Sequence, residues 1–206
     1  LENNTTGIQN IAIGYEALLT ATELDSNIAI GYEALKNMSG SAGDTGNVAI
    51  GHTAGKEMTT DKHNTFVGRT AGAQTTNGSI ENTFMGYFAG YTNKSGSSNT
   101  FIGAHSGYSF QNAENARNTY LGAYSGYYNK LGSSNVYLGY QAGYGSSGNS
   151  NTNNTGVGRD ALKVVSTGGS NVAVGYRAGD AINTGTENVL VGQDAGGALI
   201  KTYLKK

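Results

Sequence analysis

The sequence predicts an all-β fold, a parallel β-solenoid of about eleven coils, and three observations lead to this expectation. A pentad of Asn, any residue, a small, aromatic or aliphatic residue, an aliphatic residue or Met, and Gly occurs eleven times in 206 residues. Successive copies are 17 to 20 residues apart, a period typical of one solenoid turn per repeat. The 33 glycines and the absence of proline favour frequent turns and uninterrupted strand ladders. The pentads begin at Asn10, Asn27, Asn47, Asn64, Asn82, Asn99, Asn118, Asn135, Asn154, Asn171 and Asn188.

Each pentad is expected to form a short β-strand. With the Asn numbered zero, position +1 is Ile, Val or Thr, and position +3 is aliphatic or Met in every copy. Because side chains alternate between the two faces of a strand, +1 and +3 share one face, which we assign to the interior of the coil. Position +2 then points outward, although it contains no charged or strongly polar residue. The strand is therefore expected to be covered on both sides.

The +2 column predicts a homo-oligomer. If it faces outward, the array exposes an apolar stripe about 50 Å long at the usual spacing of neighbouring strands. A second copy of the same chain is the expected cover, and the alternative is a wide coil that covers the column within one chain. The aromatic members of the column are the expected oligomer interface: Phe66, Phe84, Phe101, Tyr120 and Tyr137.

Two other columns predict structural roles. Position +4 is Gly in all eleven copies, including Gly103 and Gly122, and is expected to form a backbone corner. Glycine adopts positive φ without steric cost and allows close approach of a neighbouring backbone. The Asn column, including Asn99 and Asn135, is expected to stack its side-chain amides along the axis. Ala or Ser at +7 and Gly or Leu at +8 indicate a crowded interior.

We expect one domain over residues 1–206, with coils from 10 to 196. The variable segments between coils are rich in Ser, Asn, Gly and Thr, which is typical of surface loops. Residues 197–206 are expected to cap the array or to lead into a following segment. The start of the chain resembles the loop of a preceding coil, so a fragment of a longer protein is expected.

Composition excludes some classes of function. The net charge is −1 and only 13% of residues are charged, which argues against a nucleic-acid partner. The longest apolar runs are far shorter than the roughly 20 residues of a membrane-spanning helix, so no membrane span is expected. The chain has no Cys, which excludes disulfides and thiolate metal sites. We expect no metal and no cofactor.

The central coils carry the aromatic residues that could bind a ligand. Tyrosines occupy four successive +9 positions, and another lies nearby at +6. Such a ladder could stack against sugar rings while the hydroxyls supply hydrogen bonds. The alternative is stacking for stability alone. The candidate binding residues are Tyr91, Tyr108, Tyr127, Tyr144 and Tyr124.

Catalysis has little support in the sequence. The three histidines, His52, His63 and His105, lie in different columns on different coils, so no triad is expected. Carboxylates recur at +6, and we expect them to be solvated, with an acid/base pair or a cation site on adjacent coils as the alternative. No catalytic residue is assigned, and the chain is expected not to be an enzyme. The +6 carboxylates are Glu16, Glu33, Asp160 and Asp194.

One enzyme family remains an alternative. The segment Ile13-Gly14-Tyr15-Glu16-Ala17-Leu18 resembles the hexapeptide pattern of left-handed β-helix acyltransferases. Those coils use three consecutive hexapeptides, whereas only one part of each coil matches here. This alternative requires a cleft between subunits that contains His52 or His105.

A broader resemblance is to the head-domain repeats of trimeric autotransporter adhesins and to similar repeats of phage tail fibres. It rests on units such as Ser98-Asn99-Thr100-Phe101-Ile102-Gly103-Ala104-His105-Ser106-Gly107 and extends over residues 10–196. In the adhesins such units form a left-handed parallel β-roll, and three rolls pack side by side into a head that binds host surfaces or matrix proteins. The adhesin repeats are shorter, nearer fourteen residues.

The resemblance implies an extracellular adhesin or fibre segment, at a cell surface or on a virion, that assembles as a homotrimer. Its expected partners are host-surface glycans or matrix proteins, which many weak sites would bind together by multivalency. The alternative is a purely architectural shaft.

Overall fold

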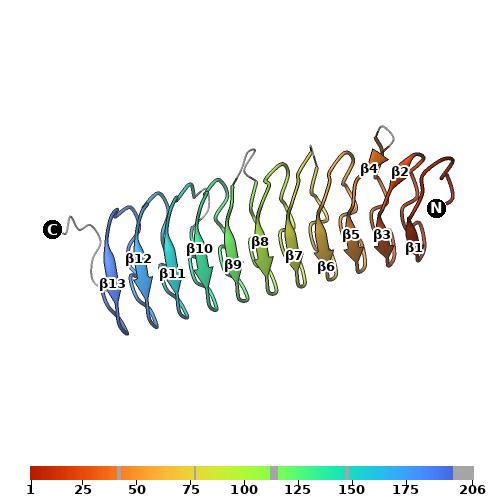
Figure 1. Cartoon of the computed structure of the whole chain (residues 1–206). Helices are drawn as coiled ribbons and strands as arrows, with labels where there is room; N and C mark the ends of the chain where they lie inside the picture. The colour runs from red at the N-terminus through yellow and green to blue at the C-terminus, as the bar shows by residue number, and fades with distance from the viewer. Residues whose placement is uncertain (41–42, 77, 112–115, 147–148, 197–206) are drawn as a thin grey trace.

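In the computed structural model the chain is a parallel β-solenoid, as the sequence predicts (Figure 1). The structure describes residues 1–40, 43–76, 78–111, 116–146 and 149–196, so the expected C-terminal cap lies outside the described residues. Eleven three-residue strands form one parallel sheet. Between the first and the last of them the chain makes about ten turns. No helix occurs among the described residues. The strands of this sheet are β1 (Ile11–Ile13), β3 (Ile28–Ile30), β5 (Val48–Ile50), β6 (Thr65–Val67), β7 (Thr83–Met85), β8 (Thr100–Ile102), β9 (Thr119–Leu121), β10 (Val136–Leu138), β11 (Thr155–Val157), β12 (Val172–Val174) and β13 (Val189–Val191).

The repeats stack in register. Each strand pairs residue for residue with the same positions of the next coil, as Phe101 of β8 does with Tyr120 of β9. A second, two-stranded parallel sheet joins β2 (Leu24–Asp25) to β4 (Gly43–Asp44). Equivalent positions of neighbouring coils therefore form straight columns along the axis of the solenoid.

The interior of the coil is filled by the +2 side chains, so the expected assignment of the strand faces is wrong. The +2 residue is buried in every strand of the large sheet from β3 to β13. Five successive rings stack face to face along the axis, with centroids 4.7 to 5.2 Å apart. Planar rings fit this interior because their stacking distance matches the spacing of the coils. The residues expected at an oligomer interface are thus core residues: Phe66, Phe84, Phe101, Tyr120 and Tyr137.

The +2 and +8 positions of one coil share the same space. A β-carbon at Gly107 would lie 2.4 Å from the ring of Phe101, and one at Gly90 would lie 2.4 Å from the ring of Phe84. In some layers where +2 is small, as at Ala29, position +8 is a buried leucine, Leu35, whereas the coils of Ala49 and Ala173 keep glycine there. An aromatic +2 residue therefore excludes a side chain at +8, and a small +2 residue leaves room for one.

The Asn column forms a continuous hydrogen-bonded ladder inside the coil. The Asn99 side-chain oxygen accepts bonds from the backbone N–H and the amide of Asn118, at 3.0 and 3.2 Å. The Asn99 amide donates to the Asn82 side-chain oxygen at 3.0 Å. Asn135 makes the same bonds to Asn118 and Asn154. The coils on both sides therefore satisfy the hydrogen-bonding groups of each buried side-chain amide.

The glycines at +4 form the corner that follows each strand. Their φ angles lie between 129° and 141°, outside the range that L-residues readily adopt. A β-carbon at Gly103 would also lie 2.6 Å from the carbonyl oxygen of Gly122 on the next coil. Both the backbone conformation and the close approach of the next coil require glycine at this position.

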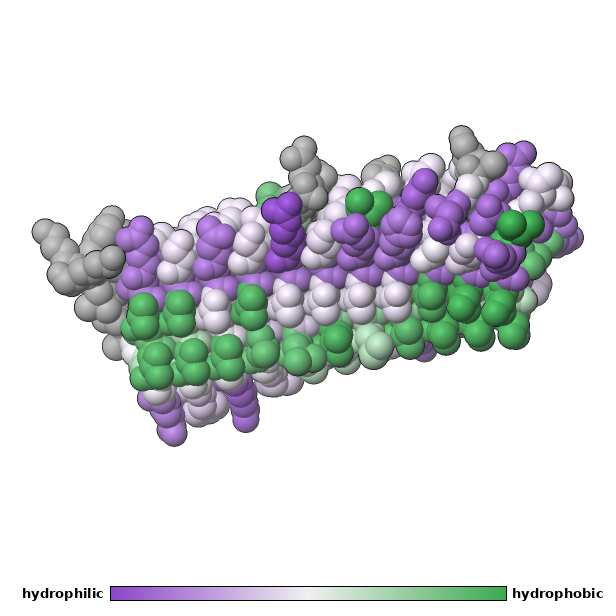
Figure 2. All heavy atoms as spheres, viewed as in Figure 1, coloured by the Kyte–Doolittle hydropathy of each residue, from purple (hydrophilic) through white to green (hydrophobic). Residues whose placement is uncertain are grey.

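The +1 and +3 side chains point outward, in contrast to the sequence-based expectation. The +3 column forms an apolar band along the sheet, whose ends are the most exposed, with Ile13 at 59% and Val191 at 69%. Figure 2 shows this band on one face of the molecule, beside the polar row of loop residues. Over the described part of the chain, no helix is long and apolar enough to cross a membrane.

Candidate binding surface

The turn after each corner glycine carries positions +5 to +10. Positions +7 and +8 are buried in the core, whereas +6 and +9 lie at the surface beside the sheet. Position +6 has a positive φ in all eleven copies, for example 57° at His105 and 59° at Tyr124. Backbone bonds to the next coil hold this turn in register, such as Ser109 N to Tyr127 O at 3.0 Å. Because the turns are in register, side chains at +6 and +9 form two further columns on one face. We call the part of this face formed by residues 88–144 the aromatic face.

The +9 column of the aromatic face is a ladder of stacked tyrosines. Ring centroids are 5.2 Å apart from Tyr91 to Tyr108, 5.0 Å from Tyr108 to Tyr127 and 5.3 Å from Tyr127 to Tyr144. These rings are half-buried, and burial raises the pKa of Tyr108, Tyr127 and Tyr144. The hydroxyls of these three tyrosines therefore remain protonated near neutral pH and can both donate and accept hydrogen bonds.

A second ladder at +6 runs beside the tyrosines. The imidazole of His105 stacks on Phe88 at 5.5 Å and on Tyr124 at 5.0 Å. Its Nδ1 is buried and has no hydrogen-bond partner among the described residues. Burial lowers the pKa of His105, so the ring is uncharged near neutral pH. The two ladders together form an uncharged aromatic surface.

Ion pairs border this surface at the N-terminal end. The ammonium of Lys36 lies 2.5 Å from Glu16 and 2.8 Å from Glu33, and that of Lys56 lies 2.8 Å from Glu33. Hydrogen bonds from Lys36 and Lys56 lower the pKa of Glu33 to about 2. Glu33 is largely buried by these contacts, so the expectation that it is solvated is wrong.

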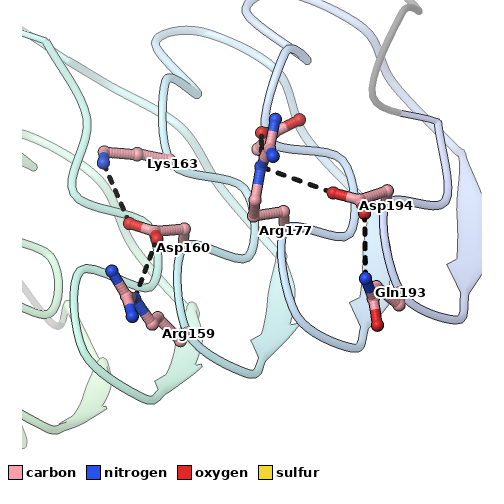
Figure 3. A network of polar contacts seen from close by, with 7 residues as sticks. Arg159, Asp160, Lys163, Arg177, Gln193 and Asp194 are labelled. Carbon is pink, nitrogen blue, oxygen red and sulfur yellow. Dashed lines mark hydrogen bonds and ion pairs between the residues drawn. The ribbon is translucent and has the colours of Figure 1, made fainter.

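A second set of ion pairs borders the surface at the C-terminal end (Figure 3). Asp160 lies between Arg159, at 3.3 Å, and Lys163, at 2.9 Å. On the next coil Arg177 reaches Asp194 at 3.4 Å. Asp160 is also largely buried, so it too departs from the expected solvated state. The +6 carboxylates of both ends are thus neutralised by neighbouring cations.

A groove opens beside the first rung of the tyrosine ladder. It has a volume of about 620 Å³ and spans three coils. Its floor includes Ala73, which occupies the +9 position next to Tyr91. One side carries Lys56, and the other carries Tyr91 and Lys94. The groove exists because Ala73 has no ring where the next four coils each have a tyrosine.

The histidines and the +6 carboxylates do not come together in one site of the described structure. The three histidines do not meet: His52 stacks on Tyr32 at 4.9 Å, whereas His105 lies within the aromatic face. His63 is exposed in a loop. No group of three or more His, Cys, Asp or Glu side chains that could hold a metal occurs in the described residues. Glu16 and Glu33 share Lys36 as a partner instead of forming an acid/base pair.

The structure brings the five candidate tyrosines together, with Tyr124 adjoining the +9 ladder through Tyr127 at 5.7 Å. The sequence also places Phe88 in this aromatic region, but neither Phe88 nor His105 is among the binding residues expected from it. A pattern in the sequence indicates them, because three successive +6 positions are aromatic: Phe88, His105 and Tyr124. The sequence-based expectations also did not include the groove, which depends on the absence of a ring at Ala73.

A scan against protein-family models found no match, and searches of curated proteins and of solved structures found no similar protein. The resemblance to adhesin and tail-fibre repeats therefore remains a prediction.

Proposed function

We propose that this chain is a non-enzymatic segment of an extracellular adhesin or fibre, on a cell or a virion, whose copies associate through the sheet face and expose the aromatic face to a target. The proposal rests on one observation: the array has two separate surfaces, an apolar band and the aromatic face. The +3 column gives an apolar band over all eleven coils, while the aromatic face lies at the adjacent turn.

The apolar band is best covered by further copies of the same chain. Its exposed members recur at the spacing of the coils, about 4.8 Å, so a second array with a parallel axis offers ridges and grooves of the same period. Side-by-side association of three copies about a common axis covers the band of every copy. This assignment retains the expected homotrimer but moves its interface from the +2 to the +1 and +3 columns. Exposed members of the band include Ile13, Ile50, Met85, Leu121, Val174 and Val191.

The oligomer is tested by the solution mass, measured by light scattering coupled to size exclusion. We expect about three times the mass of the chain. The double variant Leu121→Lys/Val174→Lys should reduce the mass to that of one chain, because charges would replace apolar contacts at the interface. A matched variant at exposed loop positions, Lys62→Glu/Lys94→Glu, should keep the oligomer. A monomeric wild-type chain would overturn this part of the proposal.

The aromatic face supports attachment to glycans. Tyrosine and histidine rings offer flat apolar surface for sugar rings, and the tyrosine hydroxyls supply hydrogen bonds. Each coil repeats the same kind of contact, so weak sites act together along one array and across copies. A matrix protein that bears such glycans, or a glycan of a host surface, fits this chemistry.

Binding is tested with fixed host cells and with an array of immobilised glycans. The variant Tyr108→Ala/Tyr127→Ala removes two central rungs and should lower binding at least tenfold while the oligomer persists. The control Tyr15→Ala/Tyr32→Ala removes a stacked pair of the same chemistry, 5.2 Å apart, from another column. Equal loss in both variants, or no loss in the first, would contradict the role of the aromatic face. A wild-type chain that binds neither target would favour a purely architectural shaft.

A further inference from the structure

The stack of tyrosines ends at Tyr91. Tyr108 stacks on one side of Tyr91 at 5.2 Å, and Phe88 of the same coil contacts the ring edge to face at 4.9 Å. On the side away from Tyr108 the preceding coil has Ala73 in place of a tyrosine, and Gln74 there donates a hydrogen bond to the Tyr91 hydroxyl at 3.2 Å. The groove lies at this end of the ladder, where a fifth ring would continue the stack.

The size and lining of the groove suit a sugar. Its volume of about 620 Å³ lies within the range of roughly 300–1,000 Å³ that is usual for small-molecule sites. Thr70, Thr76, Gln74 and Glu57 line it together with Tyr91. The hydroxyls of Thr70 and Thr76 donate to the carbonyl oxygens of Arg69 and Lys94, which leaves their oxygens as acceptors. Several hydroxyl partners around one flat apolar surface are what a pyranose ring requires.

One of the two lysines of the groove is available to an acidic ligand. Lys56 is already paired with Glu33 at 2.8 Å, and Glu57 accepts a hydrogen bond from Asn37 at 2.9 Å. Lys94 is exposed and forms no ion pair with any residue that the structure describes. It lies on the same coil as Tyr91, so a ring on Tyr91 can direct a carboxylate to the Lys94 ammonium.

We propose that this groove binds the terminal ring of an acidic saccharide, a carboxylated pyranose that stacks on Tyr91 as the next rung of the ladder and pairs its carboxylate with Lys94. The inference rests on the proposed attachment function and names its ligand class. The oxygens of Thr70, Thr76 and the Gln74 amide accept hydrogen bonds from the ring hydroxyls, and the Glu57 carboxylate accepts a further one. The remaining tyrosine ladder then provides a surface for the following sugar units.

The experiment is ligand-observed NMR on the intact chain with two matched pairs of probes. Methyl glucuronide is compared with methyl glucoside, and sialyllactose with lactose, so that each pair differs by the acidic group and the two sources of carboxylate are distinguished. We expect binding of at least one acidic member with an affinity at least tenfold above that of its neutral partner. Absence of binding by both acidic probes at millimolar concentration would overturn the proposal.

Three variants locate the site. Ala73→Tyr should abolish binding by filling the groove, and it should fold because the next four coils carry Tyr at the same position. Lys94→Gln should remove the preference for the acidic probe, whereas Tyr91→Ala should weaken both members of a pair. As a control, Tyr15→Ala, in the +5 column of the first coil and outside the aromatic face, should leave binding unchanged. Binding that survives Ala73→Tyr would place the ligand elsewhere and contradict the proposal.

The two proposals fail separately. A chain that attaches to cells through Tyr108 and Tyr127 but ignores both acidic probes would refute the acidic ligand and keep the adhesin role. A chain that binds an acidic probe in the groove but does not attach to cells would refute the adhesin role and keep the site.

Discussion

The ring of Phe101 lies beside the α-carbon of Gly107 in the same coil, where a β-carbon would be 2.4 Å from the ring. The same relationship joins Phe84 to Gly90 and Tyr120 to Gly126. A core layer with an aromatic +2 residue therefore has no room for any side chain at +8. Leucine occurs there only in layers with a small +2 residue, as in the coil of Ala29 and Leu35.

Replacement of Gly107 by Ala should destabilise the chain by roughly 2–4 kcal/mol. The methyl group would overlap the Phe101 ring, and the φ of 58° disfavours any residue with a β-carbon. The measurement is the urea midpoint followed by circular dichroism. An Ala variant with an unchanged midpoint would show that the Phe101 ring has room to move.

Replacing Phe101 and Gly107 together should destabilise the chain less than replacing Phe101 alone. Phe101→Ala alone leaves a cavity and should cost about 3–5 kcal/mol. The double variant Phe101→Ala/Gly107→Leu reproduces the layer of Ala29 and Leu35, so it should be more stable than Phe101→Ala. It should remain less stable than the wild type, because two ring stacks are lost. A double variant no more stable than the single one would refute the idea of shared volume.

Loss of one rung of the Asn ladder should depend on its place in the array. Asn99→Ala removes the acceptor of the buried Asn118 N–H, which should cost roughly 1–3 kcal/mol. Asn188 donates one side-chain bond to Asn171, at 2.8 Å, and its own oxygen has no partner in the described structure. Asn188→Ala should therefore lower the urea midpoint less than Asn99→Ala. Equal effects would argue that each amide acts locally, without support from both neighbouring coils.

Acidification should weaken the N-terminal coils through Glu33. Its pKa is lowered to about 2 in the folded chain, from an ordinary value of about 4.5. The stabilisation is therefore present above about pH 4.5 and is lost as the pH falls towards 2. We expect the urea midpoint of the wild type to fall more steeply over this range than that of Glu33→Gln. Parallel curves for the two proteins would contradict the role of Lys36 and Lys56.

Alkaline titration should separate the tyrosines into classes. Burial raises the pKa of the half-buried ladder tyrosines, such as Tyr108 and Tyr127, and raises it further for the fully buried Tyr120 and Tyr137. Because these pKa values are raised on folding, they favour the folded state below pH 10 and this stabilisation is lost at higher pH. Ultraviolet absorbance should show the ladder tyrosines Tyr108 and Tyr127 ionising at a lower pH than Tyr120 and Tyr137, which should ionise only with unfolding. Ionisation of Tyr120 and Tyr137 together with the ladder tyrosines in the folded chain would contradict this burial.

The sequence by itself determined the architecture of this protein. A pentad repeated every 17 to 20 residues already implies one coil per repeat. The invariant glycine at +4 implied the corner that Gly103 forms, and the Asn column implied the ladder that contains Asn99. These features could be read because each depends on one residue type at one position in every coil.

Only the tertiary structure decided which face of each strand lies inside. Both faces are apolar, with Phe101 on one side and Ile102 on the other, so the alternation of side chains does not by itself indicate the interior. The choice depends on the narrow width of the coil, which admits one stacked ring per layer and a glycine opposite it. The groove beside Tyr91 could not be predicted from the sequence either, because its side chains come from three coils that only the register of the solenoid brings together.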